Sequence, residues 1–135
     1  MFTHMIYFLA QKEHSGWFKD FEPILYYLAD HIKLQRLLRM KMNLYTNQNK
    51  VIEHASHTDV NNNDKVVPNV TISILNFTTC NGGTIIAGKK YPSNENEVLS
   101  FDNLNKHSGI VQTNAQTRIV LNIATTMQDH SINQT

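Results

Sequence analysis

Val70-Thr71-Ile72-Ser73-Ile74-Leu75 is the stretch that decides the fold, because β-branched residues recur in it with a period of two. Met40-Lys41-Met42-Asn43-Leu44-Tyr45 repeats this pattern of a β-strand. Further strands are predicted at Gly83 to Ala87, Val98 to Phe101 and Thr117 to Ala124. The sequence from about Leu37 onward is therefore predicted to be β.

Segments rich in turn-forming residues separate these strands. They are Asn61-Asn62-Asn63-Asp64, Asn81-Gly82-Gly83, Pro92-Ser93-Asn94 and Lys106 to Gly109. Short strands at this spacing, with no helical segments between them, favour a sandwich or jelly roll over a parallel α/β sheet. We therefore expect a mainly β fold.

An amphipathic helix is predicted ahead of the strands, within residues 18–39. Its apolar side chains recur every three or four residues, at Phe18, Phe21, Leu25, Leu28 and Ile32. Such a helix needs an apolar surface, so one or two N-terminal helices are expected to pack on one sheet. The prediction is a single domain over residues 1–127, with helical support at about 18–36, a β core at about 37–126, and a polar tail at 128–135.

Composition restricts the class of protein. A chain of 135 residues allows one domain with a modest core. No apolar run approaches the ~18–20 residues that span a bilayer, and Met5 to Ala10 lacks the flanks of a signal peptide, so no membrane association is expected. The net charge of +1 gives no support for nucleic-acid binding. A single cysteine, Cys80, excludes an internal disulfide and fits a reducing compartment, so we expect a cytoplasmic protein.

His57-Thr58-Asp59 is the first candidate for chemistry among the 7 histidines. A spacing of two on a strand points both side chains to the same face, where they can share a metal ion. A third ligand must then come from elsewhere in the fold, and His107 is the one downstream histidine before the tail. His54 lies three residues before His57, so we expect it on the opposite face, toward solvent.

Arg118 makes this set more specific, because it interrupts an otherwise apolar strand from Thr117 to Ile123. A buried guanidinium cannot lose its charge and needs a partner. Two interpretations stay open: a structural role, at a solvent-facing edge or paired with Asp102, and a bidentate clamp on a carboxylate ligand. Together with the His-x-Asp pair and His107, this arginine describes a facial triad of two histidines and one carboxylate, which suits non-haem Fe(II) oxygen chemistry.

The order of these motifs resembles the Fe(II)/2-oxoglutarate-dependent oxygenases, whose fold is a double-stranded β-helix, a cupin-like jelly roll. The similarity is strongest to prolyl-4-hydroxylase-like members, in particular small ones from marine phage and metagenomic sequences, and covers roughly residues 1 to 126. The matching segments are Phe2-Thr3-His4, Arg39-x-Lys41-x-Asn43-Leu44-Tyr45, His57-x-Asp59, Asn76 with Gly82-Gly83-Thr84, Pro92-x-Asn94-x-Asn96, Val98 to Asp102, His107-Ser108-Gly109 and Arg118 to Asn122.

This resemblance implies roles for the matching residues. His57, Asp59 and His107 match the iron ligands of the family, and Arg118 matches the residue that binds the distal carboxylate of 2-oxoglutarate. Tyr45 matches an aromatic hydroxyl that contacts the co-substrate or lines its pocket.

Weaker candidates complete the expected co-substrate pocket. Asn43 and Asn122 are implied there, although ordinary strand surface is the alternative for both. Many relatives have a tyrosine just before the asparagine of the strand after His-x-Asp, where this chain has Ile74-Leu75-Asn76. Thr71 or Ser73 is the expected substitute for that hydrogen bond. Relatives also carry extra residues ahead of the N-terminal segment, so we expect a trimmed form or a thinly covered barrel face.

The activity implied by the resemblance is hydroxylation of a prime substrate, coupled to decarboxylation of 2-oxoglutarate to succinate. The cofactors would be Fe(II), 2-oxoglutarate as co-substrate and molecular oxygen, with stimulation by ascorbate. The prime substrate stays open between a protein side chain such as proline, a small molecule and a modified base. The implied location is the cytoplasm of a microbe or of a phage-infected host cell.

Three other functions stay open on the sequence. A jelly roll that binds a ligand or partner without turnover predicts metal binding without consumption of a co-substrate. A structural phage or host interaction protein predicts no metal dependence. A zinc hydrolase needs only the two histidines and the aspartate, but Arg118 argues against it, because hydrolysis at zinc requires no clamp for a dicarboxylate.

Overall fold

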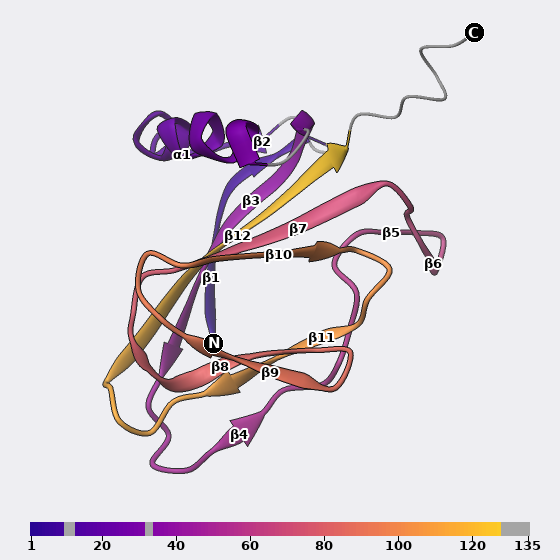
Figure 1. Ribbon diagram of the computed structural model, residues 1–135. Helices are drawn as coiled ribbons and strands as arrows, with labels where there is room; N and C mark the ends of the chain where they lie inside the picture. The colour runs from indigo at the N-terminus through magenta and orange to yellow at the C-terminus, as the bar shows by residue number, and fades with distance from the viewer. Residues whose placement is uncertain (10–12, 32–33, 128–135) are drawn as a thin grey trace, which may run out of the picture.

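The computed structural model describes residues 1–9, 13–31 and 34–127, and these are mainly β (Figure 1). The chain begins with β1 (Phe2–Phe8), β2 (Glu13–His14) and the helix α1 (Phe18–His31). The strands that follow are β3 (Leu34–Thr46), β4 (Ile52–Glu53), β5 (Asn61–Asn62), β6 (Lys65–Val66), β7 (Val70–Asn76), β8 (Cys80–Ile86), β9 (Lys89–Ser93), β10 (Val98–Asp102), β11 (His107–Val111) and β12 (Thr117–Met127). Within the described ranges, no helix is long and apolar enough to span a membrane.

Two antiparallel sheets form the body of the protein. The larger has the order β10-β7-β12-β3-β1-β2 and the smaller the order β4-β11-β8-β9. From β3 to β12 the pairs of strands are nested, so that the earliest strand pairs with the latest. The pairs are β3 with β12, β4 with β11, β7 with β10, and β8 with β9. A long hairpin wound in this way is a jelly roll, so the predicted fold class is confirmed.

The alternation of side chains along the larger sheet gives it two apolar faces. One face meets the smaller sheet, where Tyr45, Ile72 and Ile74 pack with Val111 of β11. The other face lies under α1, which buries Leu28 against a cluster that includes Leu121. The helix therefore packs on one face of the larger sheet, as its apolar spacing predicted (Figure 1).

The boundary between helix and sheet differs from the prediction. The helix α1 ends at His31, and β3 already begins at Leu34, inside the segment expected to be helical. Residues of β3 pair with β12 on one side and with β1 on the other, and this pairing outweighs the helical spacing of the apolar residues. The strand β1 was not predicted, and the described residues hold one helix. The predicted polar tail at 128–135 lies outside the described residues.

Three of the four segments predicted as turns lie partly in strands of the smaller sheet. Gly82 and Gly83 lie in β8, Pro92 lies in β9, and His107 begins β11. A Cβ atom at Gly82 would lie 2.8 Å from the carbonyl oxygen of Ile110, so this glycine permits close strand packing. Pro92 is tolerated because β9 forms the edge of the smaller sheet.

Candidate metal centre and its cavity

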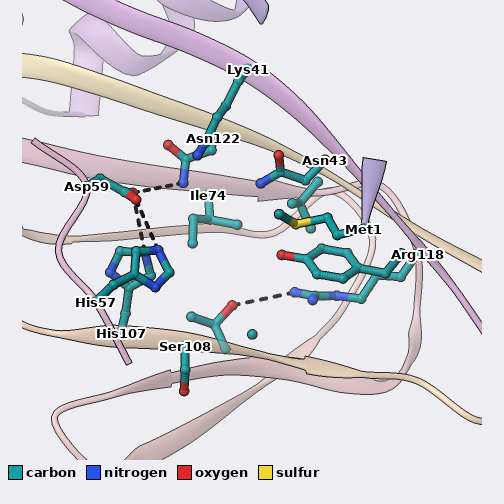
Figure 2. Close-up of a pocket in the computed structure, with 14 residues that line it drawn as sticks. Met1, Lys41, Asn43, His57, Asp59, Ile74, His107, Ser108, Arg118 and Asn122 are labelled. Carbon is teal, nitrogen blue, oxygen red and sulfur yellow. Dashed lines mark hydrogen bonds and ion pairs between the residues drawn. The ribbon is translucent and has the colours of Figure 1, made fainter. Parts of the chain in front are cut away.

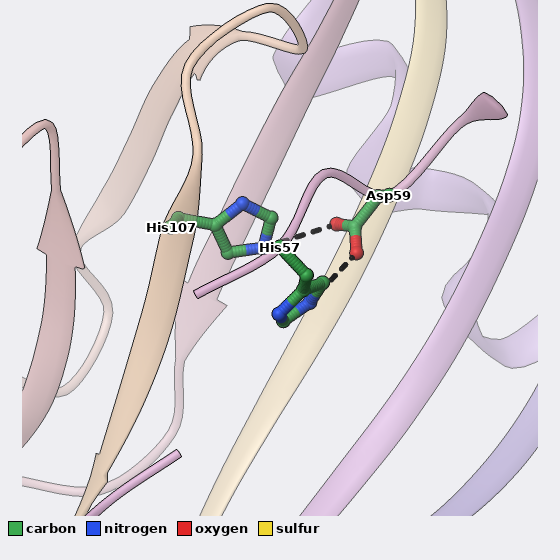
Figure 3. Close-up of side chains that lie close together, drawn as sticks. All are labelled: His57, Asp59 and His107. Carbon is green, nitrogen blue, oxygen red and sulfur yellow. Dashed lines mark ion pairs between the residues drawn. The ribbon is translucent and has the colours of Figure 1, made fainter. Parts of the chain in front are cut away.

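Three side chains with metal-binding atoms converge between the two sheets: His57, Asp59 and His107 (Figure 3). Their ligand atoms all lie within 4.8 Å of one another. The Nε2 atom of His57 lies 3.3 Å from Oδ1 of Asp59, and Nε2 of His107 lies 3.3 Å from Oδ2. Donors bound to one ion at about 2.0–2.2 Å lie about 3 Å apart, so the two distances to Asp59 fit a single metal ion.

Backbone hydrogen bonds fix the two histidines relative to each other. The amide of His57 donates to the carbonyl of His107, and the amide of His107 donates to the carbonyl of His57, both at 2.9 Å. This isolated bridge joins the segment after β4 to the start of β11. Asp59 lies in a bend rather than in a strand. His57 and Asp59 therefore come together because the chain bends at Asp59, and not because they share one face of a strand, as their spacing predicted.

Asn103 holds the chain that follows Asp59. Its side-chain Nδ2 atom donates to the backbone carbonyls of Val60 and Val67, and its side-chain Oδ1 atom accepts from the backbone amide of Val60. The residue is 1% exposed, and each such hydrogen bond contributes about 1 kcal/mol. Sequence reasoning missed this residue, because its role depends on a contact with a distant segment.

Four side chains contact the Asp59 carboxylate. Besides the two histidines, Asn122 Nδ2 donates to Oδ2 at 3.1 Å, and Arg39 Nη2 lies 3.5 Å from the same oxygen. Burial acts to raise the pKa of Asp59, but hydrogen bonds from His107 and His57, together with the nearby charges of His107 and Arg39, outweigh it and hold that pKa well below its ordinary value. The carboxylate is therefore ionised in the metal-free protein and available to a cation.

His57 is the exposed member of the set. Its side chain is 51% exposed, against 6% for His107 and 2% for Asp59. The hydrogen bond to Asp59 raises the pKa of His57, and burial opposes this only in part. A bound ion is therefore closest to solvent on the His57 side.

In the metal-free protein we expect the pKa of His57 to lie above about 6.5, and we expect the substitution Asp59→Asn to lower this pKa toward that value. A raised pKa means that the protonated pair stabilises the fold below about pH 6.5 and that this contribution is lost as the pH rises through the folded-state pKa. Solvent screening keeps the contribution small. Histidine NMR titration checks this, with exposed Asp102→Asn as control; the same His57 pKa in wild type and Asp59→Asn would contradict it.

A narrow cavity extends from the ligands into the barrel (Figure 2). Its volume is about 60 Å³, enough for a few water molecules at roughly 10–15 Å³ each. Four predicted pocket residues line it: Asn43, Tyr45, Arg118 and Asn122. Lys41 and Thr84 also line it and were not predicted.

Thr71 is absent from the lining, which corrects one expectation. It lies between Val70 and Ile72, which pack into the core between the sheets, so its side chain points to the opposite face of β7. Ser73 lies on that face too, where its hydroxyl is 2.8 Å from that of Ser100. Thr84 of β8, a strand of the smaller sheet, does line the cavity with a hydroxyl-bearing side chain.

Arg118 lies across the cavity from the histidines and is 1% exposed (Figure 2). Its Nη2 atom donates to Asn76 Oδ1 at 3.3 Å and to Thr84 Oγ1 at 3.4 Å. The guanidinium lies 5.2 Å from the ring centroid of Tyr45, and Nε is buried without a hydrogen-bond partner in the described part of the chain.

Both structural interpretations of this arginine are wrong. Arg118 does not face solvent, and it forms no ion pair with Asp102, whose exposed side chain accepts from the amide of Leu104. Burial lowers the pKa of Arg118, but a guanidinium stays charged at neutral pH. Across residues 1–9, 13–31 and 34–127 no carboxylate lies within 4.0 Å of it. It is a buried cation held by neutral groups.

His54 also differs from its expected position. It is half-buried, and its ring centroid lies 5.8 Å from that of Tyr45. Its Nε2 atom is buried with no hydrogen-bond partner among the described residues. Residues 54–56 are not part of a strand, so the alternation used to place this side chain toward solvent does not apply.

Fold and site together define a jelly-roll protein with a candidate His-Asp-His metal centre. No family model matches the sequence, and no curated protein matches it. Among solved structures, a cupin protein from Bacteroides fragilis is similar, with a TM-score of 0.48 and 12% sequence identity over 80% of this chain and 83% of that chain.

Proposed function

We propose that the protein is an Fe(II)- and 2-oxoglutarate-dependent dioxygenase that hydroxylates a protein side chain such as proline, or a small molecule. The observation that carries the proposal is the pairing of two features in one narrow cavity. A three-donor metal set with one carboxylate lies at one end, and the buried Arg118, without a carboxylate partner in the described chain, lies at the other.

The donor set supports iron as the metal. Two imidazoles and one carboxylate on one face of an ion leave adjacent positions for a chelating 2-oxo acid and for oxygen, and this ligand set is typical of non-haem Fe(II) oxygenases. When bound, the metal would supply activation of oxygen at the expense of the 2-oxo acid.

The remaining lining supports 2-oxoglutarate as the co-substrate. Arg118 would bind the carboxylate far from the metal, in the bidentate manner for which a guanidinium is shaped. The hydroxyl of Thr84 lies beside that guanidinium and can donate to the same carboxylate. Ile74 and Val120 line the cavity with apolar surface and help to exclude water. Asn122 acts on the metal ligand Asp59 through the hydrogen bond described above.

An anaerobic titration of the metal-free protein with Fe(II) and 2-oxoglutarate tests the proposal. We expect the visible charge-transfer band of the iron chelate of the 2-oxo acid, followed by succinate formation when oxygen is admitted. Absence of the band at saturating iron and co-substrate would overturn the proposal. A band without succinate would instead support a jelly roll that binds the ligand without turnover.

A further inference from the structure

The inner face of β3 carries a series of polar side chains that the metal set and Arg118 do not account for. Arg39, Lys41 and Asn43 alternate with the apolar Met40 and Met42. Met40 and Met42 belong to the cluster under α1, so the polar series points between the sheets. Arg39 contacts Asp59, whereas Lys41 lines the cavity itself.

Strand register places the two cationic residues of the cavity at its two ends. Lys41 lies opposite Asn122, whose amide donates to Asp59, and Tyr45 lies opposite Arg118. These cross-strand pairs are four residues apart, which is about 13 Å along a strand at about 3.3 Å per residue. Figure 2 shows Lys41 extending toward Asn122 and Asp59, away from Arg118.

Lys41 is not needed to neutralise Asp59. That carboxylate already has contacts from His57, His107, Asn122 and Arg39. Lys41 has no carboxylate oxygen within 4.0 Å in the described residues, although it is half-buried.

The charged side chains that line the cavity favour an anionic ligand. Asp59 is the one acidic side chain among the lining residues, which also include Lys41 and Arg118. A divalent ion on the metal ligands would add further positive charge. Buried cations without counter-charges are costly, so a ligand that brings negative charge to both ends is favoured.

We propose that Lys41 is a second anion-binding residue, which binds the carboxylate group next to the metal and makes the cavity selective for ligands with negative charge at both ends. For the activity proposed above, on which this assignment rests, that group is the carboxylate beside the keto group of the 2-oxo acid. Lys41 would then orient the metal-bound end, while Arg118 binds the distal end.

Calorimetric titration of the Mn(II)-saturated full chain with oxalate and 2-oxoglutarate tests this assignment. Oxalate occupies the metal end alone, so Lys41→Met should weaken both ligands by the same factor, about tenfold for one charge-assisted hydrogen bond. Arg118→Met should weaken 2-oxoglutarate alone. Lys50→Met removes an exposed lysine and should change neither affinity. Lys41→Gln replaces Lys41→Met if the methionine variant does not fold.

The outcomes separate this inference from the proposed function. Wild-type affinity of Lys41→Met and Lys41→Gln for both ligands would overturn the role of Lys41 and leave the oxygenase proposal intact. Failure of the wild type to bind 2-oxoglutarate, with oxalate still weakened by Lys41→Met, would overturn the oxygenase proposal and support Lys41 as an anion-binding residue.

Discussion

Replacing His107 with alanine is expected to lower the affinity for a divalent metal ion at least about 100-fold. Loss of a residue that only supports a ligand already costs about 10–100-fold, and His107 supplies a donor atom itself. The reciprocal backbone bonds between His57 and His107 do not involve the lost imidazole, so the local chain path should be kept. Competition with a chromogenic chelator measures the affinity.

His14→Ala is the matched control, because this exposed histidine lies in β2, outside the ligand set. It should bind metal like the wild type. Unchanged affinity in His107→Ala, with circular dichroism showing a folded protein, would rule out the His-Asp-His site.

Replacing Arg118 with methionine should weaken 2-oxoglutarate at least about 100-fold and leave metal affinity unchanged. Two charge-assisted hydrogen bonds to one carboxylate are together worth roughly 3 kcal/mol or more, and each 1.4 kcal/mol is tenfold in affinity. Because Arg118 has no ion-pair partner in the described chain, its removal leaves no unpaired buried charge, so the variant should still fold. Titration of the iron-dependent visible band measures the affinity.

Two further variants sharpen this result. Arg118→Lys keeps the charge but loses the forked geometry, so its affinity should lie between those of wild type and Arg118→Met. Arg36→Met removes an exposed arginine and should leave the band unchanged. If Arg118→Met binds 2-oxoglutarate like the wild type, the arginine does not hold the distal carboxylate.

The fold was predictable where the signal is local. The alternation in Val70–Asn76 and Thr117–Met127 identifies two strands, because a period of two depends only on neighbouring residues. The end of α1 and the existence of β1 depend instead on which segments pair with β3, and short-range patterns do not contain that information.

The candidate site, like the fold, was predictable from the sequence only in part. His57 and Asp59 are two residues apart, and Arg118 is conspicuous in an apolar strand, so sequence reasoning could single them out. The position of Lys41 near the metal ligands follows from its register opposite Asn122, which only the folded chain reveals. The alternation of Lys41 with methionines was the signal that could have suggested an inward-facing polar strand.

The reciprocal backbone bridge between His57 and His107 has a consequence for metal selectivity. Because the backbone positions of two ligand residues are fixed before an ion arrives, the protein does not need to fold around its ion to bring them together. Affinities for first-row divalent ions should therefore follow the general series in which copper exceeds zinc and both exceed iron. Iron occupancy in the cell then depends on which metals are supplied, and the metal content of purified protein should vary with the growth medium.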